Sequence, residues 1–181
     1  LDEMSGGLVK SAIEAEEFSG KEGETAYFHL VGNSKIKARR LLLVGVGDPK
    51  DYKTAQVSQM AGTSVRSLRS KNAKTIAIVP RATGDAKSIG GATVEGSLIG
   101  SFEPDKYRTV DKDQKRIDRV VVCINGAKEE SIKAGLDRGR VVGESVNFTR
   151  DLANEPGASM TPTETSGAPL AARLSIEAQE P

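Results

Sequence analysis

The sequence is poor in the residue types that build several common catalytic and metal sites. Its 181 residues include one cysteine, Cys123, and one histidine, His29. A lone cysteine cannot form a disulfide within the chain. One histidine and one cysteine cannot hold zinc unless carboxylates supply nearly all of the ligands. Serine hydrolysis is also disfavoured, because His29 is the only histidine that could act as the base, and it lies in an expected strand.

Aromatic residues are scarce at 4%, the charges nearly cancel at a formal net charge of +1, and no long hydrophobic run occurs. Platforms for stacking single-stranded nucleic acid are therefore few, and a membrane span is not expected. The near-neutral charge argues against a dedicated nucleic-acid or membrane-surface binder. Two basic runs are expected to be exposed loops that acids elsewhere balance: Lys35, Lys37, Arg39 and Arg40, then Lys112, Lys115, Arg116 and Arg119.

What the chain does contain is typical of a globular protein, with 37% hydrophobic and 28% charged residues. Its length allows one domain with a proper core plus an appendage. No signal-peptide pattern is present, so a reduced, cytoplasmic setting is expected. The chain begins at Leu1 without a methionine, which suggests a fragment of a longer protein.

Residues 1–127 alternate strand and helix patterns, which predicts one α/β domain. A helix is expected over residues 1–17, with a weak point at Gly6-Gly7. Residues 24–31 and 40–46 predict antiparallel neighbouring strands. The uninterrupted apolar runs 41–44 and 75–79 predict strands that are covered on both faces, the first of them central. Further helices are expected at 57–72 and 89–102 and a strand at 117–124, giving a mixed sheet flanked by helices on both faces.

The longest helical pattern covers residues 128–156, and it would span roughly 40 Å. Gly135, Gly139 and Gly143 lie four residues apart on one side of this helix. Each glycine costs about 1 kcal/mol relative to alanine in a helix interior. Close approach of another backbone element would offset that cost, and we expect this face to pack on the sheet.

The helix is expected to stop at Pro156-Gly157, and a second unit is expected to begin within residues 157–181. The stretch Thr161-Pro162-Thr163-Glu164 has an N-cap threonine, a proline at the first helical position and a glutamate at the third. This is the pattern of a helix start with a capping box. The helix 128–156 would then link two bodies.

The run Asn147-Phe148-Thr149-Arg150-Asp151-Leu152-Ala153-Asn154-Glu155-Pro156, followed by Thr161-Pro162, resembles the linker of the leucyl aminopeptidase (cytosol aminopeptidase) family. That family carries an N-x-x-R-D-L-x-N-x-P run before its catalytic domain. Ala158 departs from the pattern, because the family usually has Asn there. Residues 18–24 and 39–47 agree more loosely. The resemblance implies a domain-interface role for five residues: Asn147, Arg150, Asp151, Asn154 and Pro156.

The resemblance also implies that the chain is the N-terminal, non-catalytic domain of a metallo-exopeptidase that removes N-terminal amino acids from peptides. Its fold would be a three-layer α/β/α arrangement similar to a macro domain. Two divalent cations, zinc or manganese, would be held by a catalytic domain whose motifs are not found between Leu1 and Pro181. No catalytic or metal-binding residue is therefore expected in this chain. Its implied partners are its own catalytic domain, peptide substrates and further copies of the protein in a hexamer.

Two alternatives remain open from the sequence. A free-standing macro-like module could bind a nucleotide or ADP-ribose in a glycine-lined cleft, with Gly45, Gly47, Gly90 and Gly91 as its candidate residues. A purely structural oligomerisation domain is the other alternative. The turn at Gly45-Val46-Gly47 lacks the third glycine and the acidic residue of a dinucleotide-binding motif, so a tight strand-to-helix turn is expected there.

Overall fold

The computed structural model describes residues 2–30, 37–81, 84–104, 107, 109, 115–124 and 129–164. The helices are α1 (Asp2–Ser5), α2 (Leu8–Glu14), α3 (Thr54–Ser70), α4 (Ala86–Ser101) and α5 (Glu129–Ala153), and the strands are β1 (Thr25–His29), β2 (Arg40–Val44), β3 (Thr75–Ile78) and β4 (Arg119–Val122). The predicted mixed α/β class is confirmed. No helix among these residues is long and apolar enough to cross a membrane.

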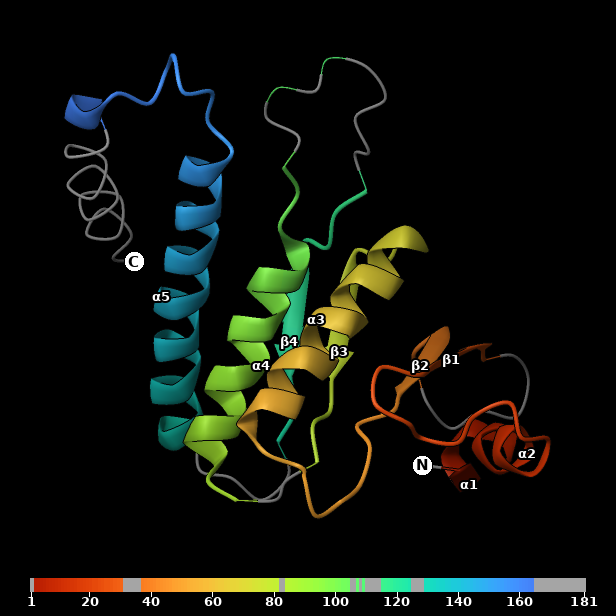
Figure 1. Cartoon of the computed structure of the whole chain (residues 1–181). Helices are drawn as coiled ribbons and strands as arrows, with labels where there is room; N and C mark the ends of the chain where they lie inside the picture. Colours follow the sequence, from red (N-terminus) through yellow and green to blue (C-terminus); the bar gives the residue numbers. More distant parts are fainter. Residues whose placement is uncertain are drawn as a thin grey trace.

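The described strands form two small sheets (Figure 1). β1 pairs with β2 in antiparallel register, Thr25 opposite Val44, as the sequence predicts. β3 pairs with β4 in parallel, Thr75 beside Arg119. Within the described ranges the four strands therefore do not make one sheet, and β2 is not central: it pairs only with β1, and its residues are half-buried. The three-layer, macro-like arrangement stays a prediction.

Strand β3 differs from its predicted environment. Ile76 and Ile78 are each 5% exposed and join the core around Ala61 of α3, whereas Thr75 and Ala77 are exposed. The described elements thus cover one face of this strand instead of both. Alanine is small enough to lengthen an apolar run without requiring burial, which is why the run alone overstated how much of the strand is covered.

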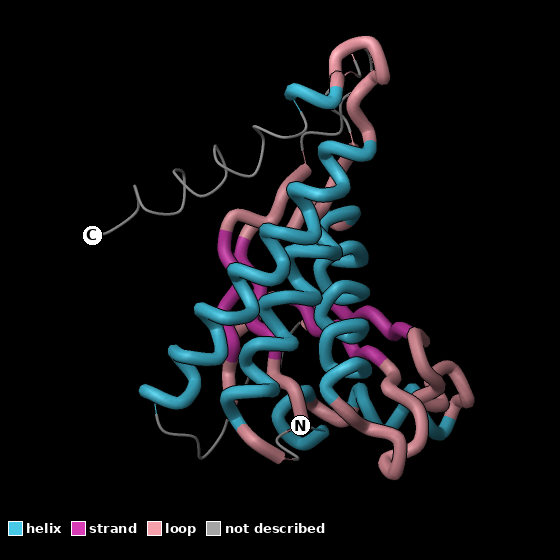
Figure 2. The backbone as a smooth tube through the Cα atoms, turned by 60° about the vertical axis from the view of Figure 1, so that its left-hand side comes forward, coloured by secondary structure: helices cyan, strands magenta, loops and turns pink. Residues whose placement is uncertain are grey.

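The helices α3, α4 and α5 lie side by side, with β3 and β4 behind α3 and α4 (Figures 1 and 2). Helix α4 is in the middle of this layer, and small residues dominate its buried positions. The hydroxyls of Thr93 and Ser97 are buried, and they donate to the carbonyls of Ile89 and Thr93 one turn earlier, at 2.8 and 2.7 Å. These bonds satisfy the buried hydroxyls, so α4 can be enclosed on both sides without losing hydrogen bonds.

Helix α5 packs on α4 through the three glycines that the sequence singles out. A Cβ added to Gly135 would overlap the carbonyl of Lys87, and one added to Gly139 would overlap the carbonyl of Gly91. At Gly143 it would come within 2.9 Å of the Leu98 side chain. The predicted close backbone approach is confirmed. The predicted partner was wrong, since the glycine face meets helix α4 and not the sheet.

A second close contact joins α4 to α3 on its other side. A Cβ on Gly96 would overlap the carbonyl of Ser58, and one on Gly100 would lie 2.6 Å from the Cα of Gly62. The sequence analysis did not single out this pair, although its four-residue spacing is the same signal as in α5. Backbone-to-backbone contact on both sides therefore fixes α4 between its two neighbours.

The two ends of the described chain agree with their patterns. The N-terminal helix is divided into α1 and α2 at Gly6 and Gly7, whose φ angles of 76° and 86° favour glycine. Helix α5 has 25 residues, about 37 Å of helix. Its existence over nearly the predicted range is confirmed, whereas its role as a linker between two bodies stays a prediction.

Candidate functional site

The C-terminal end of α4 is where two of the five predicted interface residues meet. The last carbonyls of a helix have no partner within it. From α5, Asn147 donates through Nδ2 to the carbonyl of Leu98 at 2.9 Å, and Arg150 donates through Nη1 to the carbonyl of Ile99 at 3.2 Å. Both side chains therefore cap α4, and they hold the second half of α5 against it.

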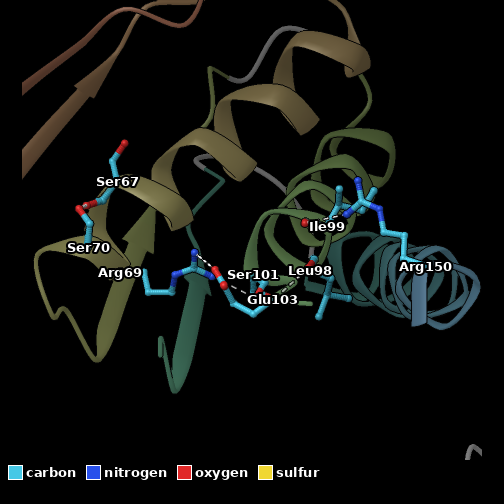
Figure 3. A network of polar contacts seen from close by, with 8 residues as sticks. All are labelled: Ser67, Arg69, Ser70, Leu98, Ile99, Ser101, Glu103 and Arg150. Atoms are coloured by element: carbon cyan, nitrogen blue, oxygen red, sulfur yellow. Dashed lines mark hydrogen bonds and ion pairs between the residues drawn. The ribbon is translucent and has the colours of Figure 1, made fainter. Parts of the chain in front are cut away.

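The same helix end is held from the opposite side by α3 (Figure 3). Arg69 donates through Nη1 to the carbonyl of Ser101 at 3.3 Å and forms an ion pair with Glu103. Its cationic head also complements the negative end of the α4 dipole. Arg69 and Glu103 were not among the sequence candidates. The available signal was the position of Arg69 in the last turn of α3, where a basic side chain can reach a neighbouring helix end.

The guanidinium of Arg150 makes a second contact at this site, because it lies 5.4 Å from the centre of the Phe102 ring. Such a cation–π contact contributes about 0.5–1 kcal/mol at an exposed site. Phe102 follows the last residue of α4 in extended conformation, so its ring marks the point where the helix ends. Arg150 thus contacts both the carbonyl of Ile99 in the last turn of α4 and the ring of Phe102, which follows the helix.

Asn147 is anchored through one side of its amide. Its Oδ1 is buried and accepts no hydrogen bond from the described residues, whereas its Nδ2 bonds to Leu98. An unsatisfied buried acceptor costs about 1–3 kcal/mol. The Asn147 side chain therefore contributes less to the stability of the fold than it would if both ends of its amide were hydrogen-bonded.

The other three interface candidates lie at the C-terminal end of α5 and do not reach α4. Asp151 is exposed. Asn154 donates through Nδ2 to the carbonyl of Arg150 at 2.8 Å, and its own N–H donates to the same oxygen at 3.0 Å. The carbonyl of Pro156 accepts from Ser159 at 2.8 Å in the following turn. Asn154 and Pro156 therefore end the helix, and Asp151 faces outward beside them.

The predicted helix start after α5 is present. Thr161 donates through its N–H at 2.9 Å and through its hydroxyl at 2.7 Å to Oε2 of Glu164, and Glu164 N–H donates back to the Thr161 hydroxyl at 3.4 Å. The N–H and hydroxyl bonds from Thr161 lower the pKa of the Glu164 carboxyl. Residues 162–164 are helical. This is the reciprocal pattern of a capping box.

The four glycines of the alternative nucleotide cleft are not brought together around a cavity. A Cβ on Gly45 would overlap the carbonyl of Lys21, and Gly91 packs against Gly135 of α5. The hollow beside Gly45, which Val44 and Met60 also line, holds about 0 Å³ of space that a water-sized molecule could enter. Ligand pockets usually measure roughly 300–1,000 Å³. Gly45 and Gly91 serve close backbone packing, and the geometry gives the nucleotide hypothesis no support.

A metal centre is also missing from the described part of the chain. No group of three or more His, Cys, Asp or Glu side chains lies close enough there to hold an ion. Cys123 is exposed and unpaired. The family resemblance implies that the catalytic domain binds the divalent cations, and the described side chains of this chain form no site for them.

Comparison with known families decides where this domain belongs. The family model for the N-terminal domain of the cytosol aminopeptidase family matches residues 1–111. The chain belongs to the cytosol aminopeptidase family. The predicted resemblance, drawn mainly from residues 147–156, is thereby confirmed by a match over a different part of the chain.

Relatives of this cytosol aminopeptidase domain are much longer than the chain. The probable cytosol aminopeptidase of Alkaliphilus metalliredigens is 33% identical over 172 residues, which is 91% of this chain and 34% of that protein. The probable cytosol aminopeptidase of Solibacter usitatus is 35% identical over 165 residues, 90% of this chain and 33% of that protein. The chain spans about a third of the length of these relatives.

Solved structures show the same fold. A tomato leucine aminopeptidase mutant superimposes with a TM-score of 0.74 at 23% identity, covering 90% of this chain and 31% of that one. The bottromycin maturation enzyme BotP, in complex with Mn, superimposes with a TM-score of 0.67 at 23% identity, covering 84% of this chain and 30% of that one. The domain therefore has the fold that both proteins have in the matching third of their chains.

Proposed function

We propose that this chain is the non-catalytic N-terminal part of a metal-dependent leucyl aminopeptidase that removes N-terminal amino acids from peptides in the cytoplasm. The observation that carries the proposal is the match to the N-terminal domain model over residues 1–111, in a chain that covers about a third of its relatives. Two divalent cations, zinc or manganese, would be bound by the catalytic domain. The described residues of this chain contribute no ligand cluster.

The domain's task in the longer protein would be assembly into a homo-oligomer, a hexamer by the family resemblance, and framing of access to the active site. Its parts would be the N-terminal domain 1–127, the linker helix 128–156 and the start of the catalytic domain at 157–181. The capping box of Thr161 and Glu164 supports a new helical unit after α5.

The interface residues would divide this work between them. Asn147 and Arg150 bind the end of α4, so they would fix the direction in which α5 leaves the N-terminal domain. Asn154 and Pro156 would end the helix at a defined residue, and the exposed Asp151 would be available to the catalytic body. A linker helix that is held against the N-terminal domain up to its last turns would transmit the position of one domain to the next.

The test is hydrolysis of a chromogenic leucine amide with manganese or zinc, by this chain alone and by the product of the full reading frame. We expect activity only in the longer product, abolished by a chelator. Chelator-sensitive turnover that co-purifies with the chain alone would overturn the assignment of a non-catalytic role. Inactivity of the longer product would overturn the aminopeptidase assignment. Light scattering of the longer product tests the hexamer through its mass.

A further inference from the structure

Helix α5 has a second apolar side, opposite the glycines that pack on α4. Val141, Phe148 and Leu152 follow one another at steps of seven and four residues. At 3.6 residues per turn they fall within about 40° of one another, and about 180–220° around the helix from Gly139. We call Val141, Phe148 and Leu152 the outer strip. Since one apolar stripe suffices for a helix that covers one core, a second stripe indicates a second body to be covered.

The outer strip is open to a partner. Among the described helices and strands, α4 is the element that packs along α5, and α5 is the outermost helix of its layer (Figure 1). Val141 is 45% exposed, and Phe148 and Leu152 are half-buried. Contiguous apolar surface of this kind marks a site of interaction.

The hydroxyls beside the outer strip are already satisfied within α5. Ser145 Oγ donates to the carbonyl of Val141 at 2.7 Å, and Thr149 Oγ1 donates to the carbonyl of Ser145 at 2.9 Å. Helix α4, which is enclosed on both sides, satisfies its buried Thr93 and Ser97 in the same way. An apolar surface can therefore cover the outer side of α5 without leaving a hydroxyl unbonded.

The size of the outer strip favours a tethered partner over a second copy of the chain. Three apolar side chains present on the order of a few hundred Å², about as much as the largest apolar patch of an ordinary monomer. A stable interface between separate proteins buries about 800 Å² on each partner. A tethered domain needs less, because a short linker holds it at a local concentration of about millimolar.

The chain after α5 leads toward the same side. The N–H groups of Ser159 and Met160 both donate to the carbonyl of Pro156, at 2.8 and 3.1 Å, so the backbone turns directly after the helix. The next helical residues, 162–164, lie beyond the end of α5 on the side away from α4 (Figure 1). Whatever follows them in a longer protein is therefore tethered close to Leu152, the last member of the outer strip.

We propose that the outer strip is the docking surface for the catalytic domain of the longer protein, which packs an apolar surface of its own against it. This inference rests on the proposed function and deepens it, by naming the side of the linker helix that the catalytic domain covers. Asn147 and Arg150 hold α5 to the N-terminal domain on one side. The outer strip holds it to the catalytic domain on the other, so the linker helix is packed between two domains.

The experiment measures how fast a maleimide labels Val141→Cys, in the 181-residue chain and in the product of the full reading frame. Peptide mass spectrometry follows this site separately from Cys123. Lys10→Cys, at an exposed position of α2, is the matched control. Ser145→Cys, also exposed, repeats the test beside the outer strip with a nearly isosteric change, in case Val141→Cys does not fold.

We expect Val141→Cys to react at least about tenfold more slowly in the longer protein than in the 181-residue chain, because a covered site is labelled only when it opens. Lys10→Cys should react equally fast in both. Equal rates for Val141→Cys and for Ser145→Cys in the two proteins would refute the docking surface. Protection that disappears when the longer protein is diluted to single chains would also refute it, because a second copy would then be the partner.

Leucine-amide turnover by the same preparation separates this inference from the function on which it rests. Rapid labelling of Val141→Cys in an active longer protein refutes the docking surface and leaves the aminopeptidase assignment standing. Slow labelling in an inactive longer protein supports the docking surface and counts against the aminopeptidase assignment.

Discussion

Gly139 of α5 faces Gly91 of α4 so closely that a Cβ on Gly139 would overlap the carbonyl oxygen of Gly91. No side chain separates the two helices at this point. The roughly 1 kcal/mol that a helical glycine costs is therefore offset by contact between backbones. Adding even one methyl group at this contact should therefore disturb the packing of α5 on α4.

The first prediction is that Gly139→Ala lowers the melting temperature, although alanine favours helix by about 1 kcal/mol. Overpacking against a rigid carbonyl costs about 1–3 kcal/mol, and Gly139→Leu should cost more. Thermal unfolding followed by circular dichroism measures the change. The control is Ala134→Leu at an exposed position of α5, which should be nearly neutral. A stabilised Gly139→Ala variant would show that the interface is looser than described.

The second prediction concerns Arg150, which binds the carbonyl of Ile99 and lies over Phe102. Arg150→Met keeps most of the apolar stem but loses both interactions, and it should destabilise the chain by about 1 kcal/mol. Urea unfolding gives the free energy. Arg138→Met, at an exposed site on the same helix, serves as the control. If the two substitutions lower the free energy of unfolding equally, the contacts of Arg150 with the end of α4 do not stabilise the fold.

The third prediction is a pH dependence at the start of α4. The Ser88 hydroxyl and N–H, together with Lys87 N–H, donate to Asp85 and lower its pKa below the ordinary value of 3.8. A carboxyl whose pKa is lowered by folding stabilises the folded state above its unfolded pKa, and that stabilisation is lost as the pH falls through the folded pKa. The cap should therefore contribute fully at neutral pH.

We accordingly expect Asp85→Ala to lower the melting temperature at neutral pH. The difference in melting temperature between this variant and the wild type should narrow as the pH falls below 3.8. Asp85→Asn keeps a cap acceptor but does not titrate, so its gap to Asp85→Ala should change little with pH. Calorimetry of the three proteins across pH measures both gaps. If the difference in melting temperature between the wild type and Asp85→Ala stays constant in acid, the charge of Asp85 contributes nothing to stability.

The fourth prediction is that calorimetric titration with ADP-ribose produces no saturable heat. Gly45 and Gly91 are occupied by packing contacts, and the hollow near Gly45 is smaller than a ligand pocket. Heat that saturates at one ligand per chain would restore the nucleotide-binding hypothesis. Repeating such a titration with Gly45→Ala would then show whether the glycine turn is the site.

Local chemistry determined much of the fold. The break at Gly6 and Gly7, the antiparallel pairing of β1 with β2, the extent of α5 and the Thr161–Glu164 capping box each depend on residues close together in the sequence. Glycine spacing alone also predicted that α5 approaches another backbone closely. The family was predicted from residues 147–156, because a family motif is defined by the order and spacing of residues along the chain.

The tertiary structure decided which elements meet. Whether the glycine face of α5 would meet a sheet or a helix depends on how α3, α4 and α5 are ordered in space, which no local pattern encodes. The capping of α4 by Arg69 and Arg150, and the meeting of Arg40 with Lys71 and of Lys74 with Arg116, join residues more than 30 positions apart. Sequence alone determined the helices and turns, because hydrogen bonds and backbone preferences act locally. Packing of distant segments determined how α3 and α5 cap the C-terminal end of α4.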